Sequence, residues 1–238
     1  MIANQAIQDV IAENLANAST TGYKRDVAVM QSFGDVLVGS MNGAMPSSVG
    51  TLGHGVVLNR IATDFSPGAE QSTGNNYDIA LTGDAAIVVR QSGQLLLTRD
   101  GALSRSSKGL LIQSVSQAEV LDIKNKPITI PAGAKNISIS ENGTISADKT
   151  VIAQLQLRAV NSAVNAVKVS DNSYSVSVFK APSPGSSVRQ GFLETSNVSI
   201  VKEMVQMITG LRAYETNSKM LKTEDDATGR AITDVAKM

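Results

Sequence analysis

Helix-period apolar patterning is concentrated at the two ends of this chain, and this feature constrains the fold more than any other. Residues Met1 to Ala18 and the segment from about Ser199 to Met238 repeat apolar side chains every three or four positions. Between them the pattern changes to short strands and turns rich in Gly, Ser and Asn. We expect such terminal helices to pack together or to be offered to other copies of the chain. This favours an assembly subunit over an enzyme.

The N-terminal segment forms one amphipathic stripe that ends in a polar run. Its apolar members are Ala3, Ala6, Ile7, Val10, Ile11, Leu15 and Ala18. The run from Asn17 to Thr21 and the glycine after it, Gly22, predict the end of a helix, because glycine readily adopts the left-handed conformation common there. An ordinary amphipathic helix packed on its own domain is the alternative interpretation.

The C-terminal segment predicts a single helix of about five heptads, a length that favours a coiled-coil partner. Asn197 or Ser199 is available as its N-cap, and Glu203 lies in the first turns beyond. One heptad series is Met204, Leu211, Ser218, Asp225 and Ile232, and the other is Met207, Tyr214, Leu221, Thr228 and Val235, with Val201 and Ile208 beside them. Gly210 and Gly229, together with Asp225 and Thr228, weaken this seam.

The two predicted helices differ in length. At about 1.5 Å per residue, the roughly 40 residues from Ser199 onward span about 60 Å, which is more than twice the span of the first helix. We expect neighbouring subunits, or residues upstream of Met1, to cover the remainder.

The middle of the chain predicts a β-rich domain preceded by a connector. From Asp26 to about Asn59, glycines mixed with Ser and Asn predict a flexible or irregular segment. From about Ile79 to Phe179 the period becomes two, which indicates a sandwich or barrel-like domain of short strands. Its clearest alternating positions are Ile128, Ile130, Val151, Ala153, Leu155, Leu157, Ala159, Tyr174, Val176 and Val178.

One turn can be predicted in detail. Two alternating segments flank Glu141-Asn142-Gly143. A two-residue turn would set Ile139 opposite Ser146, whereas a three-residue loop with a left-handed Gly143 pairs Ile139 with Ile145 and Ile137 with Ala147. We predict the three-residue loop with a bulge at Gly143, because it keeps the apolar side chains on one face.

Composition excludes several classes of partner. Lys plus Arg equals Asp plus Glu at 21 each, so the formal net charge is zero and the basic excess of a nucleic-acid binder is absent. The chain has no Cys, which excludes disulfides and thiolate chemistry. The longest strongly apolar run, about Ala85 to Val89, is far shorter than the roughly 20 residues that span a bilayer. No secretory leader is visible, since Lys24 is the first basic residue.

Catalysis has little support in the sequence. The single histidine, His54, excludes a multi-histidine metal site, and Gly53-His54-Gly55 is too short to indicate nucleotide binding. Asp78, Asp84 and Asp100 are candidates for the carboxylate pair of a glycoside hydrolase, but each lies beside a turn-like Gly or Asn. Arg99-Asp100-Gly101 is likewise interpreted as a turn. We predict no enzyme activity, no cofactor and no metal.

Short motifs lie at both ends and in the centre of the chain. At the N-terminus the motif is Asn14–Arg25, and at the C-terminus the motifs are Gly191–Val198 and Arg212–Lys219. The central motifs are, in order, Gly53–Val56, Asp78–Gly83 and Leu97–Gly101. Together these motifs resemble those of the bacterial flagellar rod and hook proteins. The resemblance covers nearly the whole chain. It is nearest to rod proteins of the distal-rod or proximal-rod type, because the large insert of the hook proteins is absent.

Two departures from the family pattern accompany the resemblance. The family pattern begins a helical turn or more before residue 1, so we expect Met1 to be an internal methionine of a longer reading frame. The family also often has two Phe after Gly83-Asp84, where this chain has Ala85-Ala86-Ile87.

The resemblance implies a structural function. Copies would stack helically into the drive shaft of the flagellum, which transmits torque for motility, with terminal helices inside and β-domains outside. A head-to-tail contact that does not close into a ring generates such an open filament. The implied partners are the chain itself, other rod and hook subunits, and the flagellar type III export apparatus. The implied location is the basal body, outside the cytoplasm, without direct membrane insertion.

The resemblance and the periodicity together predict four regions. Residues 1–25 are the N-terminal helix and signature, 26–65 an extended connector, 66–190 the β-rich domain, and 191–238 a C-terminal helix that pairs with the N-terminal one. The predicted fold class is a mainly β central domain with long N- and C-terminal helices forming a coiled-coil-like axial domain.

The expected assembly interface lies on both terminal segments. It comprises Ile7, Val10, Ile11, Leu15, Asn17, Gly22, Tyr23, Val201, Met204, Met207, Ile208, Leu211, Tyr214 and Leu221. The alternative function is an extracellular β-rich binding or adhesion module with helical flanks, and a hydrolase is more distant. Removal of residues 1–25 and 199–238 is expected to abolish polymerisation of a rod subunit but to leave ligand binding by such a module intact.

Overall fold

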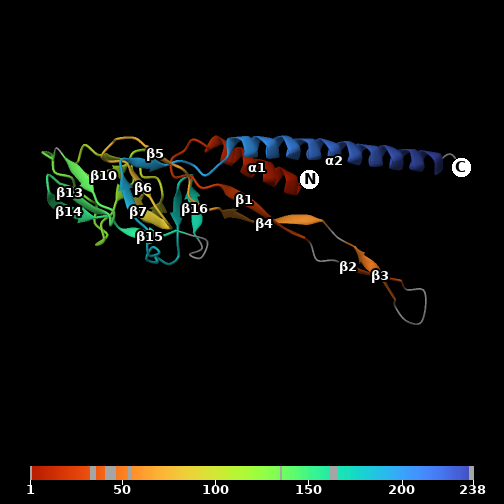
Figure 1. Cartoon of the computed structure of the whole chain (residues 1–238). Coiled ribbons are helices and arrows are strands. Elements are labelled where there is room, and N and C mark those ends of the chain that lie inside the picture. The colour runs from red at the N-terminus through yellow and green to blue at the C-terminus, as the bar shows by residue number, and fades with distance from the viewer. Residues whose placement is uncertain are drawn as a thin grey trace. The chain divides into compact units, whose positions relative to one another are not determined.

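The computed structural model describes residues 2–32, 36–40, 47–52, 55–134, 136–160 and 166–235 (Figure 1). The chain divides into two compact units. Unit 1 comprises Met1–Leu15, Asp26–Ala62 and Ile200–Met238, and unit 2 comprises Ala16–Arg25 and Thr63–Ser199. Each unit is therefore built from segments that are far apart in the sequence.

Unit 1 contains the helices and two strand pairs. The N-terminal helix α1 spans Ile2–Ala16, with 15 residues, and the C-terminal helix α2 spans Ile200–Val235, with 36. Strand β1 (Asp26–Ser32) pairs with β4 (Val56–Thr63), and β2 (Val36–Ser40) pairs with β3 (Ser47–Leu52). Neither helix combines the length and apolar character that a membrane span requires, over the residues that the structure describes.

The segment after α1 forms strands where the sequence predicts an irregular connector, so that expectation is wrong for its described residues. The stretches Asp26–Ser32 and Val56–Thr63 are rich in β-branched and other apolar residues, which suit extended backbone. The interspersed glycines do not prevent pairing. Gly39 lies at a register shift between β2 and β3, a position where glycine commonly occurs in strands.

Unit 2 is mainly β, as expected from its period-two pattern. An eight-stranded sheet runs in the order β16 (Val167–Ser170), β17 (Ser173–Ser175), β8 (Gln94–Thr98), β7 (Ala85–Gln91), β11 (Glu119–Val120), β10 (Leu111–Gln113) and β9 (Leu103–Arg105), with β15 (Leu157–Ala159) also paired to β7. A second sheet consists of β12 (Ile137–Ile139), β13 (Thr144–Ala147) and β14 (Thr150–Gln154). Two pairs complete the unit: β6 (Ile79–Leu81) with β18 (Val188–Gln190), and β5 (Glu70–Ser72) with β19 (Phe192–Glu194).

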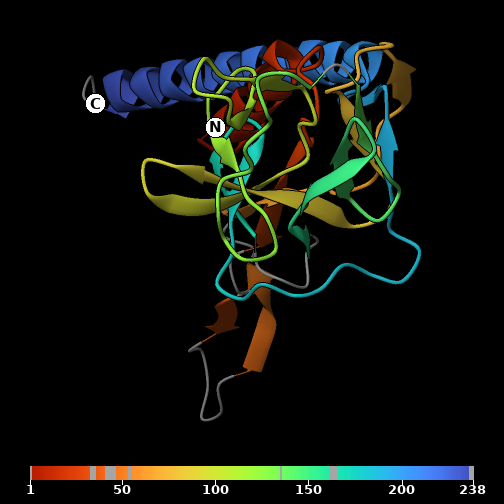
Figure 2. The same cartoon turned by 90° about the vertical axis from the view of Figure 1, so that its left-hand side faces the viewer.

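Strand β7 is buried on both faces, which explains the continuous apolar run from Ala85 to Val89. Ile87 and Val89 join the larger apolar cluster, whereas Ala86 and Val88 join a smaller cluster on the opposite face. The small alanines suit a central strand that is covered on two sides. Figure 2 looks onto unit 2, where short strands are joined by long turns.

The predicted hairpin is confirmed. Ile139 pairs with Ile145 and Ile137 with Ala147, and the N–H of Gly143 donates to the carbonyl of Ser140 at 2.8 Å. Gly143 has a φ of 80°, so it adopts the left-handed conformation that the three-residue loop requires. Local turn chemistry and the apolar alternation agree here, and the register follows from both.

Other local expectations are corrected. Val176 and Val178 lie beyond the end of β17 and belong to no strand. Asn197 is not the N-cap of α2, because the helix begins at Ile200 and the Asn197 side chain bonds elsewhere: its Oδ1 accepts from the Arg25 N–H at 2.8 Å. The N-terminal helix ends at Ala16, and Gly22 follows in the left-handed conformation with a φ of 66°.

Candidate assembly surface and buried polar junction

Helix α2 leaves most of its apolar side chains uncovered. Between Ile200 and Thr233 only Glu203 is buried, and only Met207, Gly210 and Ser218 are half-buried. We define the α2 stripe as Val201, Met204, Ile208, Leu211, Tyr214 and Leu221, which are 40% to 73% exposed. Contiguous exposed apolar side chains on one helix mark an interaction surface.

Helix α1, by contrast, buries its stripe within the monomer. Val10 and Ile11 are each 5% exposed, and Ile7 and Leu15 are half-buried. The two helices pass each other near Gly210, where an added Cβ would lie 3.5 Å from Nε2 of Gln8 (Figure 1). Of the interface residues expected from sequence, those of α1 are therefore largely covered and those of α2 largely open.

Asn14 anchors the following strand to α1. Its Nδ2 donates to the carbonyl of Asp26 at 2.8 Å, and its Oδ1 accepts from the Asp26 N–H at 2.9 Å. The side-chain amide thus replaces a neighbouring strand for one residue of β1. Because Asn14 is 1% exposed, loss of this pair would leave buried backbone groups unsatisfied.

A buried ionic cluster lies in unit 2 and joins three distant parts of the chain. Nζ of Lys24 lies 2.6 Å from Oε1 of Glu194, and Nε of Arg99 lies 2.9 Å from Oε2 of the same carboxylate. All three side chains are at most 2% exposed. We call Lys24, Arg99 and Glu194 the junction triad.

Backbone groups also pair with the side chains of the junction triad. The two terminal nitrogens of Arg99 donate to the carbonyls of Leu81, Gly83 and Ala85 at 2.7 to 2.9 Å. Nζ of Lys24 also donates to the carbonyl of Ser66 at 2.7 Å, and the Gly68 N–H donates to Glu194 at 2.9 Å. The triad therefore links the N-terminal motif, the first strands of the β-domain and β19.

The charges in the triad are coupled. Burial alone would raise the pKa of Glu194, but the charges of Arg99 and Lys24 outweigh it, so the pKa lies below its ordinary value. Burial lowers the pKa of Lys24, and the repulsion from Arg99 adds to this effect, although Glu194 acts in the opposite direction. One anion thus serves two cations, and Glu194 is the member whose charge holds the cluster together.

Glycine allows the chain segments to approach at this junction. Gly22 donates its N–H to the carbonyl of Glu194 at 2.9 Å, and an added Cβ would lie 2.5 Å from the backbone nitrogen of Asp100. A Cβ on Gly101 would overlap the carbonyl of Ile79, and one on Gly68 would overlap that of Thr195. These positions require glycine because backbone passes directly against backbone.

Asp100 is part of the same buried region, so the interpretation of Arg99-Asp100-Gly101 as a simple turn is wrong. Asp100 is 0% exposed. Its carboxylate accepts from Thr21 at 2.7 Å, from Gln113 at 2.8 Å and from Asn172 at 2.9 Å. A carboxylate held by this many donors orders the surrounding loops and is closed to solvent.

The other two candidate carboxylates stabilise turns. Asp78 accepts from Nδ2 of Asn75 at 3.0 Å, three positions earlier. Asp84 accepts from the N–H and the hydroxyl of Ser183, both at 2.8 Å. The described residues contain no group of three or more His, Asp or Glu side chains placed to hold a metal ion. His54 lies outside the described residues.

Three expected interface residues, Asn17, Gly22 and Tyr23, belong to unit 2. Asn17 is half-buried and accepts from the hydroxyl of Thr20 at 3.1 Å. Tyr23 is 0% exposed, and Nζ of Lys168 lies 4.1 Å from the centre of its ring. Sequence reasoning missed the junction triad, although each member lies inside one of the motifs that carry the family resemblance.

Comparison with known proteins assigns these motifs. A model described as "Flagella basal body rod protein" matches residues 1–24, and "Flagellar hook protein FlgE/F/G D1 domain" matches residues 80–147. "Flagellar basal body rod FlgEFG protein C-terminal" matches residues 189–234. Each of the three matches contains one member of the junction triad.

Curated relatives match along almost the whole chain. The flagellar basal-body rod protein FlgG of Agrobacterium fabrum is 32% identical, over 95% of this chain and 92% of its own length. FlgG of Borreliella burgdorferi is 32% identical over 97% and 94%, and FlgF of Caulobacter vibrioides is 28% identical over 97% and 92%. On this similarity, the chain belongs to the flagellar basal-body rod protein family.

Proposed function

We propose that this chain is a structural subunit of the bacterial flagellar basal-body rod, that it has no enzymatic activity, and that copies stack helically through their terminal helices to transmit torque. Relatives that are rod proteins by name, matched over almost their full length, support the structural assignment. The observation that carries the mode of assembly is the α2 stripe, whose apolar side chains are 40% to 73% exposed in the described monomer.

The α2 stripe has the spacing of a helix-packing seam. Leu211 and Leu221 are 46% and 48% exposed, so about half of each side chain remains to be buried by a neighbour. Full burial of a leucine is worth about 1.5–3 kcal/mol, so each of these positions offers about 1 kcal/mol to a contact. A series of such contacts along one helix favours a coiled-coil-like arrangement with helices of neighbouring subunits.

The four sequence regions have distinct roles in this proposal. The terminal regions 1–25 and 191–238 form the axial layer, and 26–65 connects it to the β-rich region 66–190. The interface is the α2 stripe, because Val10, Ile11 and Tyr23 are buried within the monomer. The partners are the chain itself, other rod or hook subunits and the flagellar type III export apparatus. The subunit then lies in the basal body, outside the cytoplasm.

The junction triad gives unit 2 mechanical continuity. It fixes the N-terminal motif, the central strands and β19 to one another through charge-assisted hydrogen bonds and backbone contacts. A shaft subunit transmits load from one chain segment to another. A buried cluster that joins chain segments distant in the sequence is suited to transmitting load between them.

The proposal is tested by placing a charge on the α2 stripe. In cells that lack the native copy, Leu211→Glu is expected to abolish swimming and the recovery of complete rods. Thr216→Glu is the matched control, since Thr216 is exposed and its hydroxyl only bonds back to the carbonyl of Arg212 at 2.9 Å. Circular dichroism of both purified variants checks that the monomer remains folded. Normal motility of the Leu211→Glu strain would overturn the proposal.

A further inference from the structure

A small pocket in unit 2 combines apolar walls with polar atoms that have no partner. It has a volume of about 140 Å³ and is lined by Val88, Leu95, Asn125, Gln156, Arg158 and Phe179. It lies on the face of β7 that carries Val88. None of these residues belongs to the junction triad or to the terminal helices.

Gln156 brings an unsatisfied amide to this pocket. The residue is 6% exposed, and its backbone is fully paired: its N–H donates to the carbonyl of Leu121 at 3.1 Å, and its carbonyl accepts from Val88 at 3.0 Å. Its side-chain Oε1 is buried and has no hydrogen-bond partner among the described residues. An unsatisfied buried polar group of this kind destabilises the folded chain unless a partner reaches it.

Arg158 supplies a second unsatisfied group. It lies on β15 directly opposite Ala86 of β7, and its Nε is buried without a partner in the described part of the chain. A half-buried guanidinium is matched best by a carboxylate, which accepts two parallel N–H bonds. The unpartnered Oε1 of Gln156 is an acceptor and cannot bond to an ionised carboxylate, so the side-chain amide must turn over and donate to the carboxylate through Nε2.

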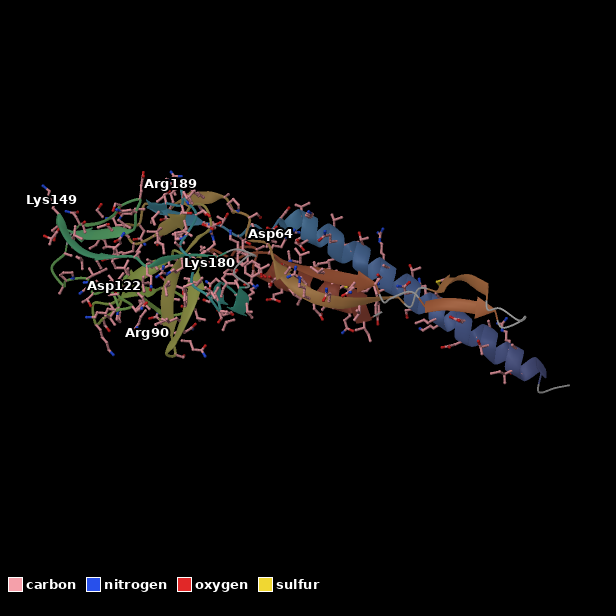
Figure 3. The ribbon with its side chains drawn as sticks, turned by 90° about the horizontal axis from the view of Figure 1, so that it is seen from below. Asp64, Arg90, Asp122, Lys149, Lys180 and Arg189 are labelled. Carbon is pink, nitrogen blue, oxygen red and sulfur yellow. The ribbon has the colours of Figure 1, made fainter. Side chains whose placement is uncertain are left out.

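The surroundings favour a negative ligand. Figure 3 labels Arg90, Asp122 and Lys180 on unit 2. Arg90 donates to the carbonyl of the lining residue Asn125 at 2.8 Å, and its charge is paired with Glu119, at 3.7 Å between Nη1 and Oε2. Of the six residues that line the pocket, Arg158 alone carries a charge, so the lining itself favours an anion.

The size and rim of the pocket indicate that the bound carboxylate belongs to a protein side chain and not to a free small molecule. A volume of about 140 Å³ is well below the roughly 300–1,000 Å³ of pockets that enclose whole small-molecule ligands. Leu95 and Phe179, 37% and 39% exposed, provide apolar surface for the atoms around such a side chain. A group with a short apolar stem and a carboxylate fits both the walls and the polar atoms.

We propose that this pocket binds the carboxylate side chain of a glutamate-sized residue presented by a neighbouring protein molecule. Arg158 and Gln156 hold the carboxylate, and Val88, Leu95 and Phe179 contact its stem. The proposal rests on the proposed function only for the presence of a neighbouring molecule, because the pocket itself lies entirely within unit 2.

Side-chain NMR of the purified chain tests the pocket. Titration with N-acetylglutamate N-methylamide is expected to shift the Arg158 Nε–H and Gln156 amide signals saturably, with a dissociation constant on the order of 1–10 mM. The corresponding glutamine compound and free propionate are each expected to bind about tenfold more weakly, because one lacks the charge and the other the peptide flanks. The proposal would be overturned if either control compound bound as tightly as the glutamate probe. It would also be overturned if the probe caused no saturable shift, which would mean that only water occupies the pocket.

Variants assign the effect to these residues. Arg158→Met is expected to abolish the backbone shifts around β15, whereas Arg60→Met, the same charge change at an exposed position on β4, leaves them intact. Gln156→Leu removes the Nε2 donor, so it is expected to weaken probe binding, and it also removes the unsatisfied oxygen, so the fold is expected to stay at least as stable. Unchanged binding in Gln156→Leu and Arg158→Met would contradict the proposal. These measurements use the monomer, so their failure is separable from a failure of the rod assignment, which motility reports.

Discussion

Replacement of Glu194 by Gln tests whether the junction triad holds unit 2 together. The carboxylate accepts from Lys24 at 2.6 Å and from Arg99 at 2.9 Å, and a carboxamide of the same shape must turn its NH₂ group toward one of these donors. The variant then buries two cations without an anion. Removal of one partner from a buried charge cluster costs about 3–5 kcal/mol, so we expect a loss of that size in the free energy of unfolding.

The matched control is Glu70→Gln. Glu70 also pairs with an arginine, Arg189, but the two side chains are 28% and 49% exposed. Water screens this pair, and its loss is expected to cost about 0–1 kcal/mol. The two substitutions change the same atoms, so the difference between them isolates the effect of burial.

Urea unfolding at pH 7 measures both variants. The chain has no Trp, and Tyr23 and Tyr174 are both 0% exposed in unit 2, so near-ultraviolet circular dichroism of tyrosine reports on this unit. Adding Lys24→Met to Glu194→Gln removes one uncompensated cation, so the double variant is expected to lose less than the sum of the single losses by about 1 kcal/mol or more. Equal losses below about 1 kcal/mol in Glu194→Gln and Glu70→Gln would refute the reasoning.

Three further outcomes follow from the structure. Gly22 and Gly74 have φ values of 66° and 68°, but of the two only Gly22 lies against the backbone of another segment. Gly22→Ala should therefore lower the free energy of unfolding in urea by about 2 kcal/mol more than Gly74→Ala does. Equal losses would contradict the close approach. Because the pKa of Glu194 is lower in the folded chain than in the unfolded one, its contribution is present above the unfolded value and is lost as pH falls through the folded value. The stability gap between the native chain and Glu194→Gln should therefore narrow below about pH 4, and a gap independent of pH would argue against a charged Glu194. Gly229 lies in α2 with open space around it, so Gly229→Ala should stabilise the helix by about 1 kcal/mol and raise the helical circular dichroism signal, and unchanged helicity would count against this.

Local patterns in the sequence predicted local structure well. The hairpin at Gly143 followed from alternation and turn chemistry within eleven residues, Ile137 to Ala147. The start of α2 and the position of Glu203 in its first turn likewise follow from neighbouring residues. The strands at Asp26–Ser32 and Val56–Thr63 are not predicted, because glycines in the same segment favour an irregular backbone as strongly as its β-branched residues favour strands.

The junction triad could not be predicted from spacing. Lys24 and Glu194 are 170 positions apart, and Arg99 and Glu194 are 95 apart. Nothing in a single sequence pairs charges over such distances, and lysine, arginine and glutamate are usually exposed. Arg99-Asp100-Gly101 was interpreted as a turn for the same reason, since a charged pair before glycine is typical of surface loops.

In the assembled rod, neighbouring subunits are predicted to cover the α2 stripe. Because the native chain has no Cys, Leu211→Cys introduces a single reactive thiol on the stripe. Maleimide labelling of this variant compares the purified monomer with basal bodies isolated from cells, with a denatured aliquot of each sample as the reference for complete labelling. We expect rapid labelling of the monomer and at least about tenfold slower labelling in the basal bodies, since a buried thiol reacts only when its surroundings open. Equal labelling rates in the monomer and in the assembled structure would contradict this prediction.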